Sequence, residues 1–130
     1  MLLLIMAMAV LPMKGITKQK FKMTKMKFNL EGMVQIHHII PRQFRNHPVL
    51  KGFDIEDGQN FIFLPTLVGK KQLNTIRPIH DGGHSEYNKF VGRHIETIYR
   101  NHPDCREEEL LQLVLSLRKN LTMQSNIPWR

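Results

Sequence analysis

Four of the seven histidines fall in two groups whose spacing could build a metal site. His37 and His38 are adjacent at the end of an apolar stretch, and His80 and His84 form a His-x-x-x-His pair further along the chain. Asn60 lies between the two groups. Neutral imidazole is a good metal ligand, and a histidine near its unperturbed pKa of about 6.5 suits general-base work. The pattern therefore supplies metal ligands and one spare imidazole.

These residue types suit the hydrolysis of a phosphodiester. That reaction needs a cation to neutralise developing charge and a base to activate water. Ligands from His37, His80 and His84 would leave coordination positions for phosphate and water, whereas a closed structural zinc site fills all four. Adjacent residues on a strand point in opposite directions, so His37 and His38 flank one site only if the strand ends there. Whether His38 is a base or a fourth ligand stays open.

Two short strands are predicted to carry the first histidine group and Asn60. Residues 33–40 are apolar and rich in β-branched side chains, and Pro41 ends the segment. Residues 61–64 form a second apolar segment between a glycine and a proline. We expect residues 42–58 to be a loop with one helical turn and residues 66–83 to be irregular.

Two helices are predicted in the second half of the chain. Residues 85–101 have an apolar stripe at spacings of three and four: Tyr87, Phe90, Val91, Ile95, Ile98 and Tyr99. His84 stands at the start of this helix, and two glycines after His80 permit the turn that would bring both histidines together. A last helix is expected over residues 105–120, with Asp104 as its N-cap. Its stripe is Leu110, Leu113, Val114, Leu117 and Leu121.

Three motifs carry a resemblance to a nuclease family. They are His37-His38-Ile39-Ile40-Pro41, Asn60 with Leu64-Pro65, and His80-x-Gly82-x-His84-x-x-Tyr87-Asn88. Together they resemble the AHH branch of the HNH nuclease superfamily over about residues 34–100. Ile36 stands where the family name records an alanine, which changes the packing behind the site and leaves the ligands in place.

The resemblance implies an α+β fold with a small ββα-metal core, in which two strands carry the doublet and the asparagine and a helix carries the last ligand. By motif position, His37, His80 and His84 look like metal ligands and His38 like the general base. Asn60 looks like the residue that braces the loop of the base. The implied activity is that of a metal-dependent endonuclease with one divalent ion. Related domains occur as toxin tips of polymorphic toxin systems, which implies a toxin effector with an immunity protein as partner.

Length and charge predict one domain with extensions. The chain has 130 residues and a net charge of +8, and six lysines lie in residues 14–27 with no acid before Glu31. This segment is either a phosphate-seeking arm or a solvated leader. We divide the chain into an extension (1–27), a nuclease core (28–103) and a C-terminal helix with its tail (104–130).

The first eleven residues are entirely apolar, which is too short a run for stable membrane insertion. A secretory signal, the remnant of a longer parent and a buried strand are the alternatives, so the localisation stays open. Cys105 is the single cysteine, which excludes an internal disulfide and a zinc site built on cysteines.

The sequence thus predicts a metal-dependent endonuclease that acts on nucleic acid, with DNA favoured over RNA. Imidazole ligands favour Zn²⁺, Ni²⁺ or Mn²⁺, and Mg²⁺ could also support activity. The alternative is a metal-stabilised module, or an inactive nuclease descendant, that binds nucleic acid without cutting it. The role of His38 separates the two hypotheses: as a fourth ligand it would close the site, and as a free imidazole it could activate water.

Overall fold

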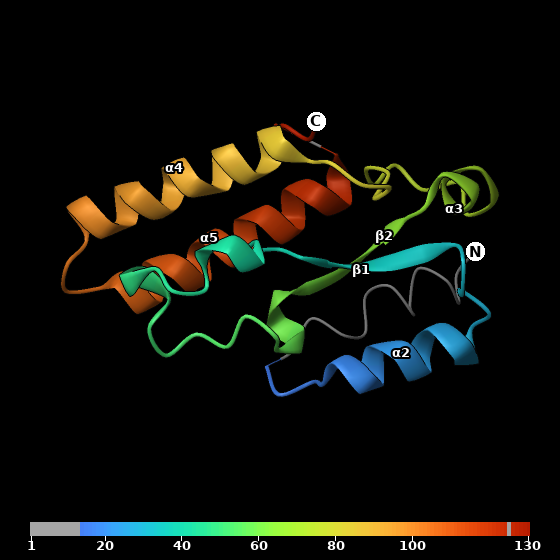
Figure 1. Ribbon diagram of the computed structural model, residues 1–130, viewed down its shortest axis with the longest axis horizontal. Helices are drawn as coiled ribbons and strands as arrows, with labels where there is room; N and C mark the ends of the chain where they lie inside the picture. Colours follow the sequence, from blue (N-terminus) through green and yellow to red (C-terminus); the bar gives the residue numbers. More distant parts are fainter. Residues whose placement is uncertain (1–13, 125) are drawn as a thin grey trace.

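The computed structural model describes residues 14–124 and 126–130, so the apolar run of residues 1–11 lies outside the described residues. The fold is α+β, with one two-stranded sheet and four α-helices in the described residues. The elements are α2 (Lys18–Lys27), β1 (Val34–His38), β2 (Phe61–Pro65), α3 (Leu67–Gln72), α4 (Ser85–Asn101) and α5 (Arg106–Met123). Figure 1 shows α2 on one side of the sheet and α4 and α5 on the other.

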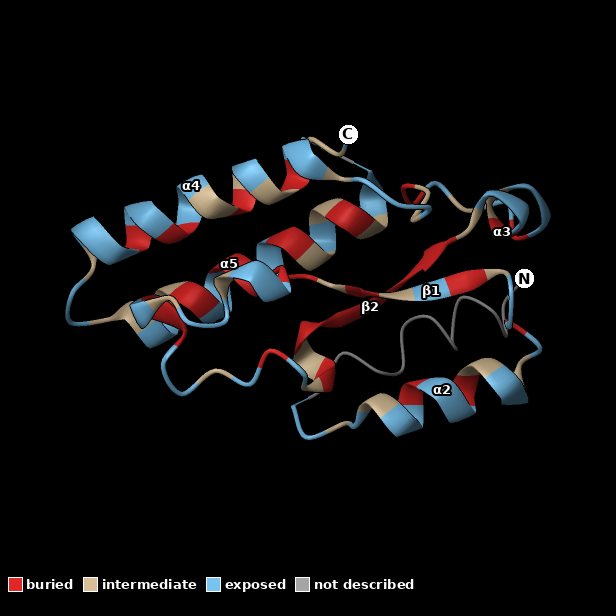
Figure 2. Cartoon of the chain, in the orientation of Figure 1, coloured by how far each residue is buried: buried red, intermediate tan, exposed pale blue. Residues whose placement is uncertain are grey.

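The strands β1 and β2 pair antiparallel, with His37 opposite Ile62 and His38 opposite Phe61. Because side chains alternate along a strand, each face of the sheet receives every second residue. All five residues of β2 are buried, and Figure 2 shows this strand red along its length. A strand buried on both faces must be covered on both, which explains the helices on either side.

Each face of the sheet has its own hydrophobic core. The larger core joins Ile62 and Leu64 of β2 to the apolar stripes of α4 and α5. All five stripe residues predicted for the last helix are buried in it. In α4 the prediction holds for Tyr87 but not for Tyr99, which is 38% exposed. Tyr99 instead lies beneath the guanidinium of Arg106, 4.4 Å from its ring centroid.

The smaller core explains why part of the lysine-rich segment is ordered. Lys18–Lys27 is a helix, with the side chain of Thr17 accepting a hydrogen bond from the Lys20 amide at its start. Phe21 is buried edge-on against Phe61 and Phe63, with ring centroids 5.3 and 5.2 Å away. One aromatic among lysines gives almost no helical periodicity, so the sequence could not separate this helix from a solvated leader. The division of the chain at residue 27 stays a prediction.

Several element boundaries differ from those expected. Residues 42–58 contain two 3₁₀ turns, Arg42–Phe44 and Pro48–Leu50, and a third, Gly58–Asn60, leads into β2. Residues 66–83 were expected to be irregular, yet α3 lies among them. The sequence did not indicate this helix because Gly69 is a residue typical of loops. In the structure a Cβ at this position would lie 1.8 Å from the carbonyl oxygen of Met33, so only glycine fits.

The C-terminal helix also begins differently from the expectation. Cys105, not Asp104, is its N-cap residue, and its side chain makes no capping hydrogen bond within the described part of the chain. The helix continues to Met123, three residues beyond the expected end. Glutamates at positions 107–109 fill its first turn, where they complement the positive end of the helix dipole. Within the described residues, no helix has the length and apolar composition that crossing a membrane requires.

Candidate functional site

The histidine doublet lies where β1 ends, and its two members face opposite sides of the sheet. His37 is 1% exposed and faces α4, whereas His38 lies against the ring of Phe61 with centroids 5.0 Å apart. Both nevertheless line one cleft, together with His80 and His84. The alternation of the strand therefore separates the two imidazoles, and the end of the strand lets both reach the same cleft.

Three of these histidines converge. His37 comes from β1, His80 from the loop before α4, and His84 is the N-cap residue of α4. One ligand nitrogen of each lies within 4.8 Å of the other two. The ring of His37 has its centroid 5.1 Å from that of either partner. The turn between His80 and His84 includes Gly82 at φ 130°, a backbone conformation that residues other than glycine rarely adopt.

Amide side chains orient two of the three imidazoles. Gln35 accepts a hydrogen bond from Nδ1 of His80 at 2.7 Å, and Asn88 accepts one from Nδ1 of His84 at 3.0 Å, in both cases through the amide oxygen. An oxygen acceptor requires the proton on Nδ1, which leaves the Nε2 lone pair of each ring for a metal. Hydrogen bonds of this kind fix the tautomer and orientation of metal-binding histidines.

The third imidazole has an unsatisfied nitrogen. Nε2 of His37 is buried and has no hydrogen-bond partner among residues 14–124 and 126–130. A buried polar atom without a partner costs about 1–3 kcal/mol, so such atoms are rare in native structures. Coordination of a cation would satisfy this nitrogen, and the donor set of three imidazoles fits a divalent transition metal.

Burial favours the neutral form of two of these imidazoles, those of His37 and His80. It lowers the pKa of His37 well below 6.5, and the neighbouring His80 and His84 lower it further. Burial is also the main cause of the lowered pKa of His80, followed by the charge of His84. The crowding of imidazoles around one point therefore opposes protonation of His37 and His80, and it favours the neutral state that binds a metal.

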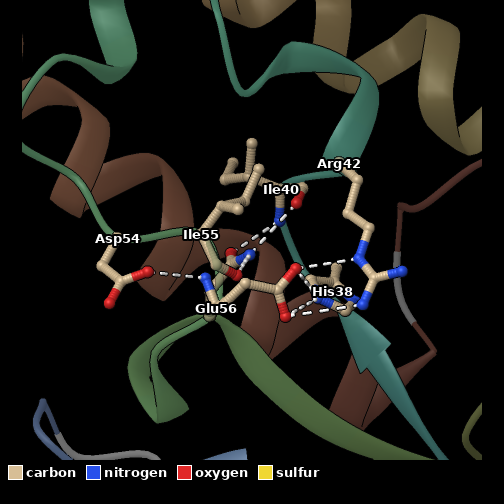
Figure 3. Close-up of polar contacts among 7 residues, drawn as sticks. His38, Ile40, Arg42, Asp54, Ile55 and Glu56 are labelled. Atoms are coloured by element: carbon tan, nitrogen blue, oxygen red, sulfur yellow. Dashed lines mark hydrogen bonds and ion pairs between the residues drawn. The ribbon is translucent and has the colours of Figure 1, made fainter.

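His38 belongs to a separate polar group. Its Nε2 lies 3.0 and 3.1 Å from the two carboxylate oxygens of Glu56, and Nε of Arg42 donates to the same carboxylate at 2.8 Å (Figure 3). The carboxylate thus holds the proton of His38 on Nε2 and leaves Nδ1 as the accepting nitrogen. Burial lowers the pKa of His38, and the hydrogen bond with Glu56 counteracts this in part.

The charge on Glu56 is maintained by its partners. Partial burial alone would raise its pKa, but the hydrogen bonds from Arg42 and His38 hold that pKa below its ordinary value. Glu56 is therefore ionised at neutral pH, and it can stabilise a protonated His38 electrostatically.

Asn60 is fully buried and ties together the segments on either side of the doublet. Its side-chain oxygen accepts from the Ile40 amide at 2.7 Å, and its Nδ2 donates to the carbonyls of Ile40 and Ile55 at 3.1 and 3.0 Å. Figure 3 shows the partner residues Ile40 and Ile55 beside the pair formed by His38 and Glu56. The main-chain oxygen of Asn60 also accepts from the Ile39 amide at 2.7 Å. The segment after His38 is therefore fixed by both the side chain and the main chain of one residue.

Two residues on the helices support the same region. The hydroxyl of Tyr87 in α4 donates to the carbonyl of Ile39, directly after the doublet. Arg118 in α5 donates to the carbonyls of Gln59 and Phe61, at 2.6 and 2.8 Å, on both sides of Asn60. Burial lowers the pKa of Arg118 to about 10, so it stays charged at neutral pH. Both helices thus contact the main chain next to the site.

The cleft has a volume of about 450 Å³ and carries positive charge near the histidines. Lys18 of α2 and Arg42 line it. Arg42 lines this cleft, whereas Arg45, Lys70, Lys71, Arg77, Lys89 and Arg93 do not. Arg77 is buried and donates to the carbonyl of Phe63, which is a structural role.

The other histidines lie away from the cleft. His94 is exposed on α4 and contacts Phe90. His47 lies in a turn and accepts a hydrogen bond from the Val49 amide at 3.1 Å. His102 ends α4 and lies 3.8 Å from the sulfur of Cys105.

Sequence reasoning identified the histidines and Asn60 but missed Glu56, Gln35 and Trp129. Gln35 could have been found, because it precedes His37 by two residues and so shares its face of β1. Glu56 carries no such signal, since it lies in an irregular segment with several other charges. Trp129 packs against the ring of His84, with centroids 5.0 Å apart, although it lies far from it in the sequence.

Comparison with known proteins gives one family. The model of AHH, described as a nuclease family of the HNH/ENDO VII superfamily with conserved AHH, matches residues 19–121. Comparison with curated proteins and with solved structures gives no match.

Proposed function

The chain belongs to the AHH nuclease family of the HNH/ENDO VII superfamily, and from that premise we propose that it is a metal-dependent endonuclease with a one-metal mechanism. In this proposal His37, His80 and His84 hold one divalent ion, His38 is the general base and Asn60 braces the loop that follows the base. The observation that carries the proposal is the unpartnered, buried Nε2 of His37 beside two imidazoles whose Nδ1 atoms are already engaged.

Three imidazoles favour Zn²⁺, Ni²⁺ or Mn²⁺ over Mg²⁺, which prefers oxygen ligands and retains its water. A divalent ion bound there would neutralise the charge that develops on the phosphate and on the leaving oxygen. His38 is held outside the ligand set by Glu56, so the three proposed ligands leave room for substrate.

The chemical step assigned to this chain is a proton transfer. Nδ1 of His38 takes a proton from a water molecule whose oxygen attacks phosphorus, and the bond from phosphorus to the leaving oxygen breaks. The leaving oxygen takes a proton from solvent. Glu56 holds the imidazole in position and stabilises its protonated form, while Arg42 keeps Glu56 ionised. The proton on His38 returns to solvent before the next cycle.

The substrate is nucleic acid, with DNA favoured over RNA, and Lys18 and Arg42 supply charge for its phosphates along the cleft. A toxin role is a further part of the proposal, by analogy with toxin domains of similar sequence. It predicts growth arrest when the chain is expressed in bacteria and rescue by an immunity protein. A chain that cuts nucleic acid without arresting growth would remove the toxin role and leave the nuclease.

The experiment is cleavage of plasmid DNA and total RNA by the full chain with Mg²⁺, Mn²⁺, Ni²⁺, Zn²⁺ or EDTA. Because general-base catalysis contributes about 10²- to 10⁴-fold, His38→Ala should lower the cleavage rate at least about a hundredfold. It should bind the ion as the unmutated chain does. His84→Ala should lose both ion and activity. His94→Ala is the matched control, since this histidine is exposed and lies away from the cleft.

Equal loss of the ion in His38→Ala and His84→Ala would contradict the division of roles and would make His38 a ligand. An ion bound by the unmutated chain without cleavage of either polymer would favour the alternative, a metal-stabilised module or inactive nuclease descendant that binds nucleic acid without cutting.

A further inference from the structure

The last residues of the chain fold back onto the histidine site. Residues 126–130 follow α5, and Figure 1 shows the C-terminus beside the first turn of α4. These residues lie beyond the segment matched by the family, which ends at residue 121. Their contacts therefore lie outside the part of the chain that the family model covers.

Trp129 contacts every member of the proposed ligand set. Its ring centroid lies 5.0 Å from that of His84, 5.2 Å from that of His37 and 6.3 Å from that of His80. It also lies 5.3 Å from the ring of Tyr87. An indole is large and rigid, so it restricts the orientations that its neighbours can adopt.

Two hydrogen bonds fix Trp129, one through its indole and one through its main-chain carbonyl. Their partners lie before His80 and after His84 in the sequence. Nε1 of Trp129 donates to the carbonyl of Ile79 at 2.8 Å, directly before His80. The carbonyl of Trp129 accepts from the Tyr87 amide at 3.2 Å, in the first turn of α4. The loop that carries His80 and His84 is therefore held at both ends by one residue.

The second of these bonds also explains how His84 can face the metal site. The first turn of a helix has amide groups without internal partners, and the N-cap side chain usually accepts from one of them. His84 occupies the N-cap of α4 but makes no capping hydrogen bond within the described residues. The Trp129 carbonyl accepts from this turn instead, which leaves the His84 imidazole for the site.

We propose that residues 127–130 form a C-terminal strap that positions the metal ligands, with Trp129 as its positioning residue. The inference rests on the proposed metal site. The strap sets the orientation of His84 and the path of the loop after Ile79, and its indole covers the ligand rings. It raises the affinity for the ion and takes no part in proton transfer.

The first test uses the single tryptophan of the chain as a reporter. Open-shell ions such as Ni²⁺ quench indole emission at short range, so titration with Ni²⁺ should quench the unmutated full chain and saturate at one equivalent. The same titration of His84→Ala should give no saturable quenching. Binding of Ni²⁺ by calorimetry without a change in emission would overturn the proposal, and this test needs no variant of the strap.

The second test measures Ni²⁺ affinity by calorimetry in the absence of nucleic acid. Loss of residues that orient metal ligands typically weakens binding 10- to 100-fold, and we expect this of Trp129→Ala. Trp129→Phe keeps an aromatic ring and loses the bond to Ile79, so its loss should be less than about tenfold. His94→Ala, exposed on α4 and outside the strap, is the control and should stay within about twofold, because surface substitutions usually change free energies by less than about 0.5 kcal/mol.

Each outcome decides a separate point. Unchanged Ni²⁺ affinity in Trp129→Ala would overturn the strap and leave the proposed nuclease standing. No Ni²⁺ binding by the unmutated chain would overturn the metal site itself, and the strap with it. Circular dichroism without metal checks that Trp129→Ala is folded. If it is not, the quenching titration of the unmutated chain decides, and Ni²⁺ binding without quenching overturns the proposal.

Discussion

At the scale of single residues, the two histidines of the doublet differ because β1 places them in different surroundings. His37 lies among other imidazoles and has no carboxylate partner in the described part of the chain, which suits a neutral ligand. His38 is bonded to Glu56, which suits a group that gains and loses a proton. The same residue type at adjacent positions is therefore proposed to have two roles, and the structural difference between the two histidines is the carboxylate.

Substitution of Glu56 tests this difference. Glu56→Ala should lower the cleavage rate about tenfold, because His38 loses its orientation and its counter-charge. The loss is smaller than the 10²- to 10⁴-fold contribution of general-base catalysis, since the base itself remains. Glu56→Gln keeps an oxygen that can accept from Nε2 and should lose less. Initial rates with plasmid DNA measure the effect, and calorimetry should show unchanged ion affinity. Glu31→Ala, on an exposed turn, is the control, and a rate in Glu56→Ala equal to it would sink the assigned role.

The three histidines that converge could be found from sequence because order and spacing alone mark them. The residues that orient them could not, apart from Gln35 on the same face of β1. Glu56 lies 18 residues from His38, and Trp129 lies in a tail with no periodic pattern. Contacts between distant segments depend on tertiary packing, and no local sequence pattern indicates which residues will make them.

At the scale of elements, α5 is coupled to the site through one side chain. Arg118 donates to the two carbonyls on either side of Asn60 and is half-buried. Arg118→Ala would leave both carbonyls without this donor, which should cost about 2–4 kcal/mol of unfolding free energy. Urea unfolding of the metal-free chain measures it. The neighbouring Lys119→Ala is the exposed control and should stay within about 0.5 kcal/mol. Similar stabilities of the two variants would show that α5 is held by its apolar stripe alone.

The helix α2 makes a different contribution, because it brings Lys18 to the cleft beside the doublet. A lysine that contacts a phosphate adds about 0.9 to the slope of log affinity against log salt concentration. In the cleavage-deficient His38→Ala background, Lys18→Gln should lower this slope by about that amount for double-stranded DNA. Lys20→Gln, two residues along and exposed, should change it less. Equal slopes in Lys18→Gln and Lys20→Gln would show that Lys18 does not contact a phosphate of the bound DNA.

Elements with a strong apolar period were predicted well, and short or polar ones were not. The stripes at spacings of three and four located α4 and α5 to within a few residues. The helices α2 and α3 were missed because their stability comes from tertiary contacts: Phe21 against the sheet, and Gly69 against the main chain of Met33. Such contacts override the weak local preference of a lysine-rich or glycine-containing segment.

At the scale of the whole molecule, the histidine site joins parts of the chain that are distant in sequence. His37 comes from the sheet, His80 and His84 from the loop before α4, and Trp129 from the terminus. Ile127 and Trp129 of the terminus pack against the larger core, whereas His80 and His84 of the loop belong to neither core. An ion bound at the site would therefore tie this loop to β1.

Metal binding should therefore stabilise the entire fold. A ligand at about 100 times its dissociation constant adds about 2.7 kcal/mol to the free energy of unfolding, which for a chain of this size raises the melting temperature by about 10 °C. Thermal unfolding followed by circular dichroism with Ni²⁺ or Zn²⁺ should show this increase, and excess EDTA should reverse it. His84→Ala should lose the increase, while His94→Ala should keep it. If His84→Ala were stabilised as much as the unmutated chain, the ion would bind elsewhere, for example at the group of His102, Cys105 and Glu109 between α4 and α5.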